Sequence, residues 1–384
     1  MAISSKKMSA STWGLHLAVL MICAIWTLPT LGILVSSLRD KDQIVASGWW
    51  AALTTSNQTG ASRLGLPATQ VEKDGKFVIE GTIFEENDKR TLGAFGTKVN
   101  APTAFPAGAP ADIGDGVTLT LNANGSYVLT SPKAFEGEQG RRVYFEAGTP
   151  PRFTTENYNN VLFSQGIGRS FINSLTVTIP STIIPILIAA FAAYALAWMR
   201  FPGRALLIAT VIGLLVVPLQ MSLIPLLRLY NGVGLFLGVP VKTYLGIWLA
   251  HTAFGLPFAI YLLRSYIAGL PREIMESARI DGASDFDIFV KIILPLSFPA
   301  LASFAIFQFL WVWNDLLVAM VFLGSGEEQL VLTGKLNALL GSRGGNWEIL
   351  TASAFVTIIV PLIVFFSLQR YFVRGLLAGS VKGG

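Results

Sequence analysis

Long apolar stretches alternate with polar segments along this 384-residue chain. Six stretches of about twenty residues or more are almost wholly apolar, namely residues 15–35, 171–198, 205–227, 243–267, 297–323 and 350–371. A helix needs about twenty apolar residues to cross the roughly 30 Å hydrocarbon core of a bilayer. The pattern therefore predicts an all-α polytopic membrane protein with six transmembrane helices.

The segment between the first two apolar stretches, residues 40–160, has a different pattern. It holds nearly half of the charged residues of the chain and is rich in Gly, Pro, Thr and Asn. Residues 76–84, 117–121 and 142–145 alternate apolar and polar side chains with the two-residue period of half-buried strands. Asn124-Gly125, just before Tyr127, is a typical hairpin turn. We therefore expect an inserted β-rich domain with its own core.

The composition agrees with this division. Hydrophobic residues make up 52% of the chain and charged residues only 13%, against about 25% charged residues in globular domains. We divide the chain into an N-terminal tail with transmembrane helix 1 (1–39), the β-rich insert (40–160) and a helical core (161–384). The single cysteine, Cys23, excludes a disulfide framework, and His16 and His251 are too far apart in sequence to predict a metal site.

Positive charge is distributed unevenly between the two sides of the predicted membrane protein. The short segments on one side carry Lys6, Lys7, Arg200, Arg204, Arg264, Arg272, Arg279, Lys291, Arg370, Arg374 and Lys382. Cytoplasmic loops are enriched in Lys and Arg, so both termini are expected in the cytoplasm and residues 40–160 outside it. The net charge of +5 therefore indicates topology and not nucleic-acid binding. The first apolar run is too long for a signal peptide and lacks a cleavage site, so we expect it to be retained.

Residues 276–295, between the fourth and fifth apolar stretches, read ESARIDGASDFDIFVKIILP. Pro271 suits the first turn of a helix, and Gly282 is a natural helix stop. Ser284 is a suitable N-cap for a second short helix over 284–293, which Pro295 is expected to end. The pattern predicts two short helices joined by a glycine turn, on the cytoplasmic side.

The spacing Glu276-Ser277-Ala278, three residues, Gly282, nine residues, Ile292-x-Leu294-Pro295 resembles the EAA loop of ABC importer permeases, with Ser277 in place of the second Ala. In that family the loop, here 268–295, docks into an ATPase subunit. The resemblance implies coupling roles for Glu276, Ser277, Ala278, Asp281, Gly282, Ile292, Leu294 and Pro295. An amphipathic segment lying at the membrane surface is the alternative.

Other segments resemble the carbohydrate-type (MalG-like) permeases: Thr155 to Tyr158, residues 171–175 and the C-terminal tail. The large insert looks most like the α-glucoside branch. The resemblance implies a bacterial inner-membrane protein that works with a second permease subunit, two ATP-binding subunits and a periplasmic solute-binding protein. No G-x-x-x-x-G-K-[ST] phosphate loop occurs, so ATP and Mg²⁺ are expected on the ATPase and no cofactor in this chain.

The fifth apolar stretch carries Gln308, Trp311, Trp313, Asn314 and Asp315. Aromatic faces and polar groups are what a sugar requires, and an ionisable residue inside a span indicates a functional site. At about 100° per residue Trp311 and Asp315 share a face, while Trp313 and Asn314 point elsewhere. We expect Gln308, Trp311 and Asp315 to line a substrate path. Alternatively, these residues lie at the membrane interface, where Trp is enriched.

Two other functions compete with a sugar permease. A permease for polyamines or peptides would share the same loop. A membrane-anchored enzyme or sensor would place its function in residues 40–160, but this segment contains no histidine and no recognisable nucleophile or metal-ligand pattern. The lone His251 is expected to hydrogen-bond a neighbouring helix.

Overall fold

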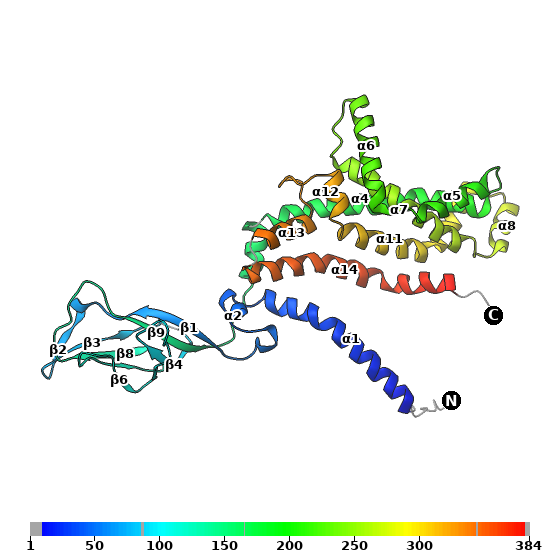
Figure 1. The fold of residues 1–384 in the computed structure, drawn as a ribbon. Coiled ribbons are helices and arrows are strands. Elements are labelled where there is room, and N and C mark those ends of the chain that lie inside the picture. Colours follow the sequence, from blue (N-terminus) through cyan, green and yellow to red (C-terminus); the bar gives the residue numbers. More distant parts are fainter. Residues whose placement is uncertain (1–9, 86–87, 165, 343–344, 381–384) are drawn as a thin grey trace. The chain divides into compact units, whose positions relative to one another are not determined.

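The computed structural model describes residues 10–85, 88–164, 166–342 and 345–380. The chain forms two compact units, Met1–Asn157 with Asn346–Thr351, and Tyr158–Gly345 with Ala352–Gly384 (Figure 1). Each unit has its own hydrophobic core. The first unit contains the β-rich domain and the second contains most of the long helices.

The first unit begins with the 28-residue helix α1 (Ala10–Ser37), which has no charged residue in its first or last turn. A short helix, α2 (Lys41–Ala46), and a 3-10 turn (Trp49–Ala51) follow. The strands among the described residues are β1 (Ser56–Arg63), β2 (Val71–Lys73), β3 (Lys76–Thr82), β4 (Thr91–Gly96), β5 (Phe105–Pro106), β6 (Pro110–Asp112), β7 (Thr118–Leu121), β8 (Ser126–Ser131) and β9 (Arg142–Thr149).

These strands form two antiparallel sheets, in the orders β1-β9-β4-β5 and β2-β3-β8-β7-β6. The inward side chains alternate along each strand, as Leu119 and Leu121 do on β7 and Val143 and Phe145 on β9. They meet in one core between the sheets. The expected β-rich domain is therefore present. The hairpin joining β7 and β8 is also confirmed, with Gly125 at φ +83°.

The two ends of the β-rich domain are tied together at the end of α1. The amide of Asn157 donates to the carbonyls of Ser37 and Arg39, at 2.9 and 2.8 Å. The backbone N–H of Thr154 donates to the carbonyl of Leu38 at 2.7 Å. The residues that lead into the β-rich domain and those that lead out of it are therefore hydrogen-bonded to each other at the end of α1.

The second unit is helical. The helices that follow the π turn Asn160–Ser164 are α4 (Ile167–Trp198), α5 (Arg204–Leu215), α6 (Leu219–Leu237), α7 (Tyr244–Ile267), α8 (Arg272–Ile280), α9 (Asp285–Ile288), α10 (Leu294–Leu296), α11 (Phe298–Trp313), α12 (Leu317–Phe322), α13 (Leu332–Ser342) and α14 (Trp347–Ser380). The first residues of α14 belong to the first unit. A four-residue helix, α3 (Glu156–Asn159), precedes the π turn. Helices α4 and α7 pack along each other and α11 packs on both.

Four described helices are long and apolar enough to cross a membrane: Ser11–Ser37, Ile167–Trp198, Tyr244–Ile267 and Trp347–Tyr371. Two further candidates are bent pairs. Helices α5 and α6 meet at 109°, and the helical segment Asp285–Leu296 meets α11 at 68°. The apolar stretches 205–227 and 297–323 are therefore each broken in the structure, which has four to six candidate spans among the described residues. Pro218 accounts for the first break, because the residue before a proline is disfavoured in helix. In the second stretch α11 ends at Trp313 and α12 begins at Leu317.

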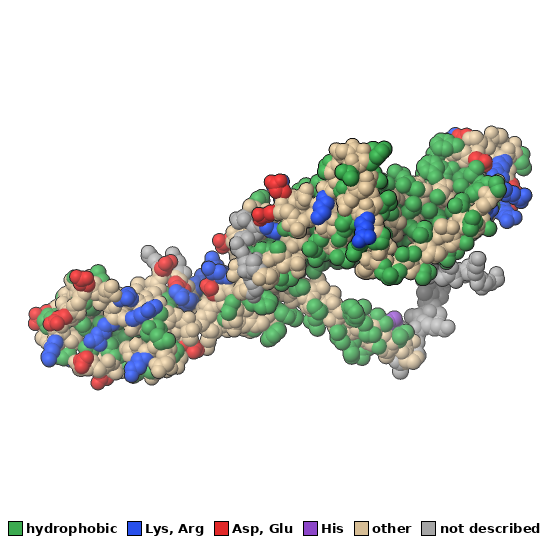
Figure 2. All heavy atoms as spheres, turned by 45° about the horizontal axis from the view of Figure 1, so that its top comes forward, with side chains coloured by type: hydrophobic (Ala, Val, Ile, Leu, Met, Phe, Trp, Pro, Cys, Tyr) green, Lys and Arg blue, Asp and Glu red, His purple; other side chains and the backbone are tan. Residues whose placement is uncertain are grey.

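The surface of the helical unit is mostly apolar. Charged side chains gather at the end that carries α8, whereas the sides of the long helices show few of them (Figure 2). Its buried positions include many polar residues: Ser170, Asn173, Ser174, Thr178, Ser181, Thr182, His251, Thr252, Ser303 and Gln308. An apolar outside around a partly polar inside is expected of helices surrounded by lipid.

Candidate coupling element and transport path

The segment from Arg272 to Leu296, called the coupling element below, begins with helix α8. The helix ends in a Schellman motif, in which Gly282 N–H donates to Arg279 O (3.1 Å) and Ala283 N–H to Ala278 O (3.0 Å). Gly282 has φ +84°, a backbone conformation that favours glycine. The sequence motif thus requires glycine because the chain reverses in a left-handed turn at this position.

The second half of the coupling element is capped as expected. Ser284 Oγ accepts a hydrogen bond from Asp287 N–H at 3.1 Å and starts α9. The expectation that Pro295 ends this helix is wrong. A π turn, Phe289–Ile293, links α9 to α10, and the chain stays helical through Pro295. The wider hydrogen-bond ring of the π turn changes the helix register before the proline, which lies in the first turn of α10.

One ion pair joins the two halves, and a second lies within the second half. Arg279 lies 3.0 Å from Asp285 across the glycine turn, and Lys291 lies 2.7 Å from Asp287 one helical turn away. The hydrogen bond to Asp285 raises the pKa of Arg279, and the hydrogen bonds from Lys291 and Ser284 lower the pKa of Asp287. These groups are largely exposed to water, so each pair adds little stability, and only the pair of Arg279 and Asp285 spans the glycine turn.

One face of the coupling element is anchored in the helical core. Met275, Ile288, Phe289 and Ile293 are buried among side chains of α4, α7 and α11. The ring of Phe289 lies 4.6 Å from that of Phe191 on α4. A displacement of the coupling element therefore acts directly on the long helices, because close-packed side chains transmit strain.

The other face is open. Ile280 and Phe286 are 86% and 66% exposed, and they lie on opposite sides of Gly282. The positions singled out by the sequence motif lie around them: Glu276, Ser277, Asp281 and Gly282 are exposed, and Ala278, Ile292 and Leu294 are half-buried. Pro295 is exposed. Sequence reasoning missed Ile280 and Phe286. Their signal was two large apolar residues, one on each side of the glycine turn, in an otherwise charged segment.

The residues expected on a substrate path all approach His251 on α7. Gln308 is buried, and its amide donates to the carbonyl of Ser181 on α4 (3.1 Å) and more weakly to that of His251 on α7 (3.4 Å). Gly255 leaves room for it, since a Cβ there would lie 2.5 Å from Gln308 Oε1. Ser181 precedes Pro185 by four residues, so no backbone N–H within α4 is available to this carbonyl.

Two indole N–H groups likewise donate to carbonyls that lie four residues before a proline. Trp313 Nε1 donates to Thr357 O at 2.9 Å, four residues before Pro361 on α14. Trp248 Nε1 donates to Thr176 O at 2.8 Å, four residues before Pro180 on α4. A proline inside a membrane helix is tolerated when neighbouring helices supply the missing hydrogen bond. Each of these three carbonyls has such a donor, and the sequence alone did not pair them.

Trp311 and Asp315 share one side of the α11–α12 break. His251 Nε2 lies 4.0 Å from Asp315 Oδ2, and the ring of His251 meets the edge of Trp311, at 6.1 Å between ring centres. Asp315 Oδ2 also accepts the N–H of Ala319 at the start of α12 (3.1 Å). The expectation that His251 hydrogen-bonds a neighbouring helix through its ring is not met, because neither ring nitrogen has a partner among the described residues. Asn314 is exposed and caps its own helix.

No group of three or more His, Cys, Asp or Glu side chains that could hold a metal ion occurs in the described part of the chain. The geometry as a whole is that of a helical membrane unit with a rigid, two-faced projection at one end. The projection has one face buried against the long helices and one face exposed.

Comparison with known proteins agrees with this description. Residues 167–377 match the family described as binding-protein-dependent transport system inner membrane component. The chain is 68% identical over 382 residues, covering 100% of both proteins, to the alpha-glucoside transport system permease protein AglG of Rhizobium meliloti (strain 1021). It is 44% identical to the osmoprotective compounds uptake permease protein GgtD of Synechocystis sp. (strain ATCC 27184 / PCC 6803 / Kazusa), covering 96% of this chain and 91% of that protein.

The chain therefore belongs to the family of binding-protein-dependent inner membrane transport components. It is an ABC importer permease subunit and not an enzyme. A solved structure of a bacterial ABC transporter involved in the import of the acidic polysaccharide alginate is similar over 59% of this chain and 82% of that chain, with 26% identity and a TM-score of 0.49.

Proposed function

We propose that this chain forms one half of the translocation path of an α-glucoside importer and that the coupling element receives the force that drives it. The observation that carries the proposal is the two-faced geometry of this element. Its buried face packs into the helices through Met275 and Phe289, while Ile280 and Phe286 remain exposed on the other face. Exposed apolar side chains next to polar ones are typical of a protein-docking surface.

The docking partner is an ATP-binding subunit, and ATP with Mg²⁺ is bound there. The complex contains a second permease, giving a heterodimeric pore, two ATPases and a periplasmic solute-binding protein. The six-span arrangement, with both termini in the cytoplasm and the β-rich domain outside, puts the coupling element on the ATPase side. The distribution of Lys and Arg between the loops supports this orientation.

The substrate is an α-glucoside. The support is the 68% identity, over the full length of both proteins, to a permease named for α-glucoside transport. Osmoprotective compounds are the second candidate substrate class, because the 44% identical relative is named for their uptake. Within this chain, Trp311 and Asp315 are the residues proposed to face the substrate, and Gln308 holds the helix that carries them.

The coupling role is tested at Gly282. Proline cannot adopt φ +84°, so Gly282→Pro breaks the turn between α8 and α9. We expect it to abolish sugar uptake and co-purification of the ATPase, while the chain still inserts in the membrane. The matched control is Gly238→Pro, since Gly238 ends α6 with φ +68° and, like Gly282, has open space at its Cβ position. Normal uptake and ATPase binding by Gly282→Pro would contradict the proposal.

The substrate is tested with the reconstituted complex and its binding protein. Uptake of a labelled α-glucoside such as maltose should exceed that of a labelled osmolyte, and an excess of unlabelled α-glucoside should suppress it. Trp311→Ala should lower uptake while ATPase binding is unchanged, because the coupling element is untouched. Preferential uptake of the osmolyte would favour the second substrate class and leave the coupling role intact.

A further inference from the structure

Three large apolar side chains are exposed at the junction between α1 and the β-rich domain. The segment from Lys41 to Leu53, called the collar below, consists of α2, the 3-10 turn Trp49–Ala51 and the residues around them. Val45, Trp50 and Leu53 in the collar are 72%, 78% and 82% exposed. A water-soluble surface carries single exposed apolar residues, but three within nine positions form a patch.

The collar is held in a fixed shape. The guanidinium of Arg39, itself buried, donates to the carbonyls of Gln43 (2.8 Å) and Ser47 (2.7 Å) and to that of Gly48 (3.1 Å). Gln43 in turn donates from its amide to Pro150 O at 2.7 Å. The exposed apolar side chains are therefore presented by an ordered structure.

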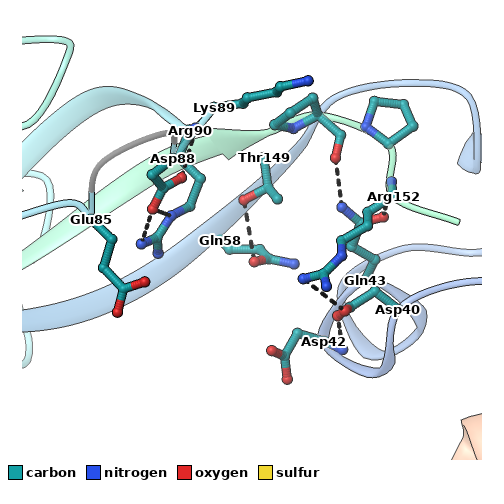
Figure 3. Close-up of a pocket in the computed structure, with 12 residues that line it drawn as sticks. Asp40, Asp42, Gln43, Gln58, Glu85, Asp88, Lys89, Arg90, Thr149 and Arg152 are labelled. Carbon is teal, nitrogen blue, oxygen red and sulfur yellow. Dashed lines mark hydrogen bonds and ion pairs between the residues drawn. The ribbon is translucent and has the colours of Figure 1, made fainter. Parts of the chain in front are cut away.

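The two sides of the collar differ in chemistry. Asp40, Asp42 and Gln43 line a polar pocket of about 620 Å³ together with Arg152, whose guanidinium lies 3.6 Å from the carboxylate of Asp40 (Figure 3). Val45 lies about 200° around α2 from the buried Gln43, and its side chain is exposed. The collar therefore carries polar side chains that line this pocket and apolar side chains that are exposed.

The collar folds back along α1. Gly32 faces the indole of Trp49, and a Cβ at Gly32 would lie only 2.7 Å from Trp49 Nε1. Gly32 precedes Ser37, the last residue of α1, by five positions, which is about 7–8 Å along the helix. Trp49 therefore lies beside the last turns of the membrane-crossing helix and not beyond its end. Leu28 and Leu31 on the same helix are exposed.

We propose that Val45, Trp50 and Leu53 insert into the lipid–water interface of the leaflet on the side of the β-rich domain. Trp49, next to Trp50 in the chain, lies beside Gly32 of α1, so the collar adjoins the exposed apolar surface of a helix that is long and apolar enough to cross a membrane. Tryptophan is enriched at this interface because its ring is apolar and its N–H polar.

A collar anchored in the interface holds the β-rich domain in a fixed orientation relative to the membrane. Because Arg39 and Asn157 bind both ends of the insert to the end of α1, a collar held in the interface restricts tilting of the domain relative to this helix. The anchor acts on this chain alone and does not depend on the transported solute.

Spin labels test the proposal in the full-length protein. The only cysteine is first replaced by Cys23→Ser, and single cysteines are then introduced by Val45→Cys, Trp50→Cys and Leu53→Cys. In phosphatidylethanolamine–phosphatidylglycerol vesicles we expect these labels to collide more with oxygen, which concentrates in the bilayer, than with a water-soluble nickel chelate. Leu20→Cys on α1 is the membrane reference, and Val99→Cys, on an exposed loop of the β-rich domain, is the water reference.

The outcomes separate the proposal from its alternatives. If the collar labels are as accessible to the nickel chelate as the label at Val99→Cys, the patch faces water. If they are shielded from both oxygen and nickel, a protein partner covers the patch. Either result would overturn the proposal. Gly32→Val adds a second measurement, because it displaces Trp49 from α1. In this background the labels at Trp50 and Leu53 should become more accessible to nickel, and unchanged accessibility would contradict the depth argument.

Discussion

The β-rich domain buries most of its large apolar side chains, whereas the helical unit exposes many of them. In the β-rich domain Phe95, Leu119 and Val143 are fully buried between the sheets, and charged residues cover the outside (Figure 2). In the helical unit large apolar side chains such as Leu187 and Phe236 are exposed. The difference teaches that the solvent, water in one case and lipid in the other, decides which residues a fold turns inward.

The inside of each unit shows the consequence. Sheets satisfy their backbone groups in the ladder, so the β-rich domain can be filled with apolar side chains. The helical unit contains prolines that remove backbone donors, and lipid supplies none in exchange. The buried side chains of Gln308 and Trp313 and the half-buried side chain of Trp248 supply these donors, so part of the polar interior supports the helices at their prolines.

The largest expected effect lies in the core of the β-rich domain. Phe95→Ala should destabilise the domain by about 3–5 kcal/mol, the usual cost of removing a buried aromatic ring. Hydrogen exchange of the full-length protein should show amides of β4 and β9 losing protection by about two orders of magnitude or more. Val99→Ala, at an exposed position, is the control and should change nothing. An equal loss of protection in α4 and α7 would contradict the view that the two units have independent cores.

A smaller effect is expected from the donors in the helical unit. Trp313→Phe leaves Thr357 O without a partner and should cost about 1–3 kcal/mol in detergent-micelle unfolding. Pro361→Ala restores a backbone N–H four residues after Thr357, so in that background the cost of Trp313→Phe should fall by about 1 kcal/mol or more. Trp26→Phe, at an exposed position of α1, is the control with the same chemical change. Equal costs with and without Pro361 would show that the indole acts through packing alone.

The smallest effect is expected at the water-exposed surface. The hydrogen bonds from Arg90 to Asp88 lower the pKa of this carboxyl group. A carboxylate with a lowered pKa stabilises the fold above its unfolded value of about 3.9, and this contribution is lost as the pH falls through the folded value. Asp88→Asn should therefore cost at most about 1 kcal/mol at pH 7 and nothing near pH 2, measured by exchange protection of β3 and β4. A cost that persists at low pH would indicate a role other than the ion pair.

The coupling element was predictable from sequence because its determinants are local. Gly282, the Ser284 cap and the basic and acidic residues around them interact within a few positions of one another. The exposure of Ile280 and Phe286 was not predictable, because it depends on which face α4 and α7 cover. The role of Pro295 was also missed, since a π turn changes the hydrogen-bond register before it.

The residues proposed for the transport path show the opposite case, because their partners lie far away in the chain. The helical period correctly separates Trp311 and Asp315 from Trp313, but it cannot say what each side chain meets. Gln308 and Trp313 contact carbonyls 127 and 44 residues away in the chain, and His251 approaches Asp315 from another helix. Such pairs come only from the packing of α4, α7, α11 and α14.

The sequence by itself determined the two solvents of this protein, the length of its apolar helices, the alternation of its strands and the glycine turn of the coupling element. Each follows from residues that are near in the chain and from the 3.6- and 2-residue periods. Tertiary structure alone decided the back-folding of Trp49 onto Gly32 and the donor that reaches each carbonyl left without a partner by a proline. These depend on contacts between distant segments, which local periodicity does not encode.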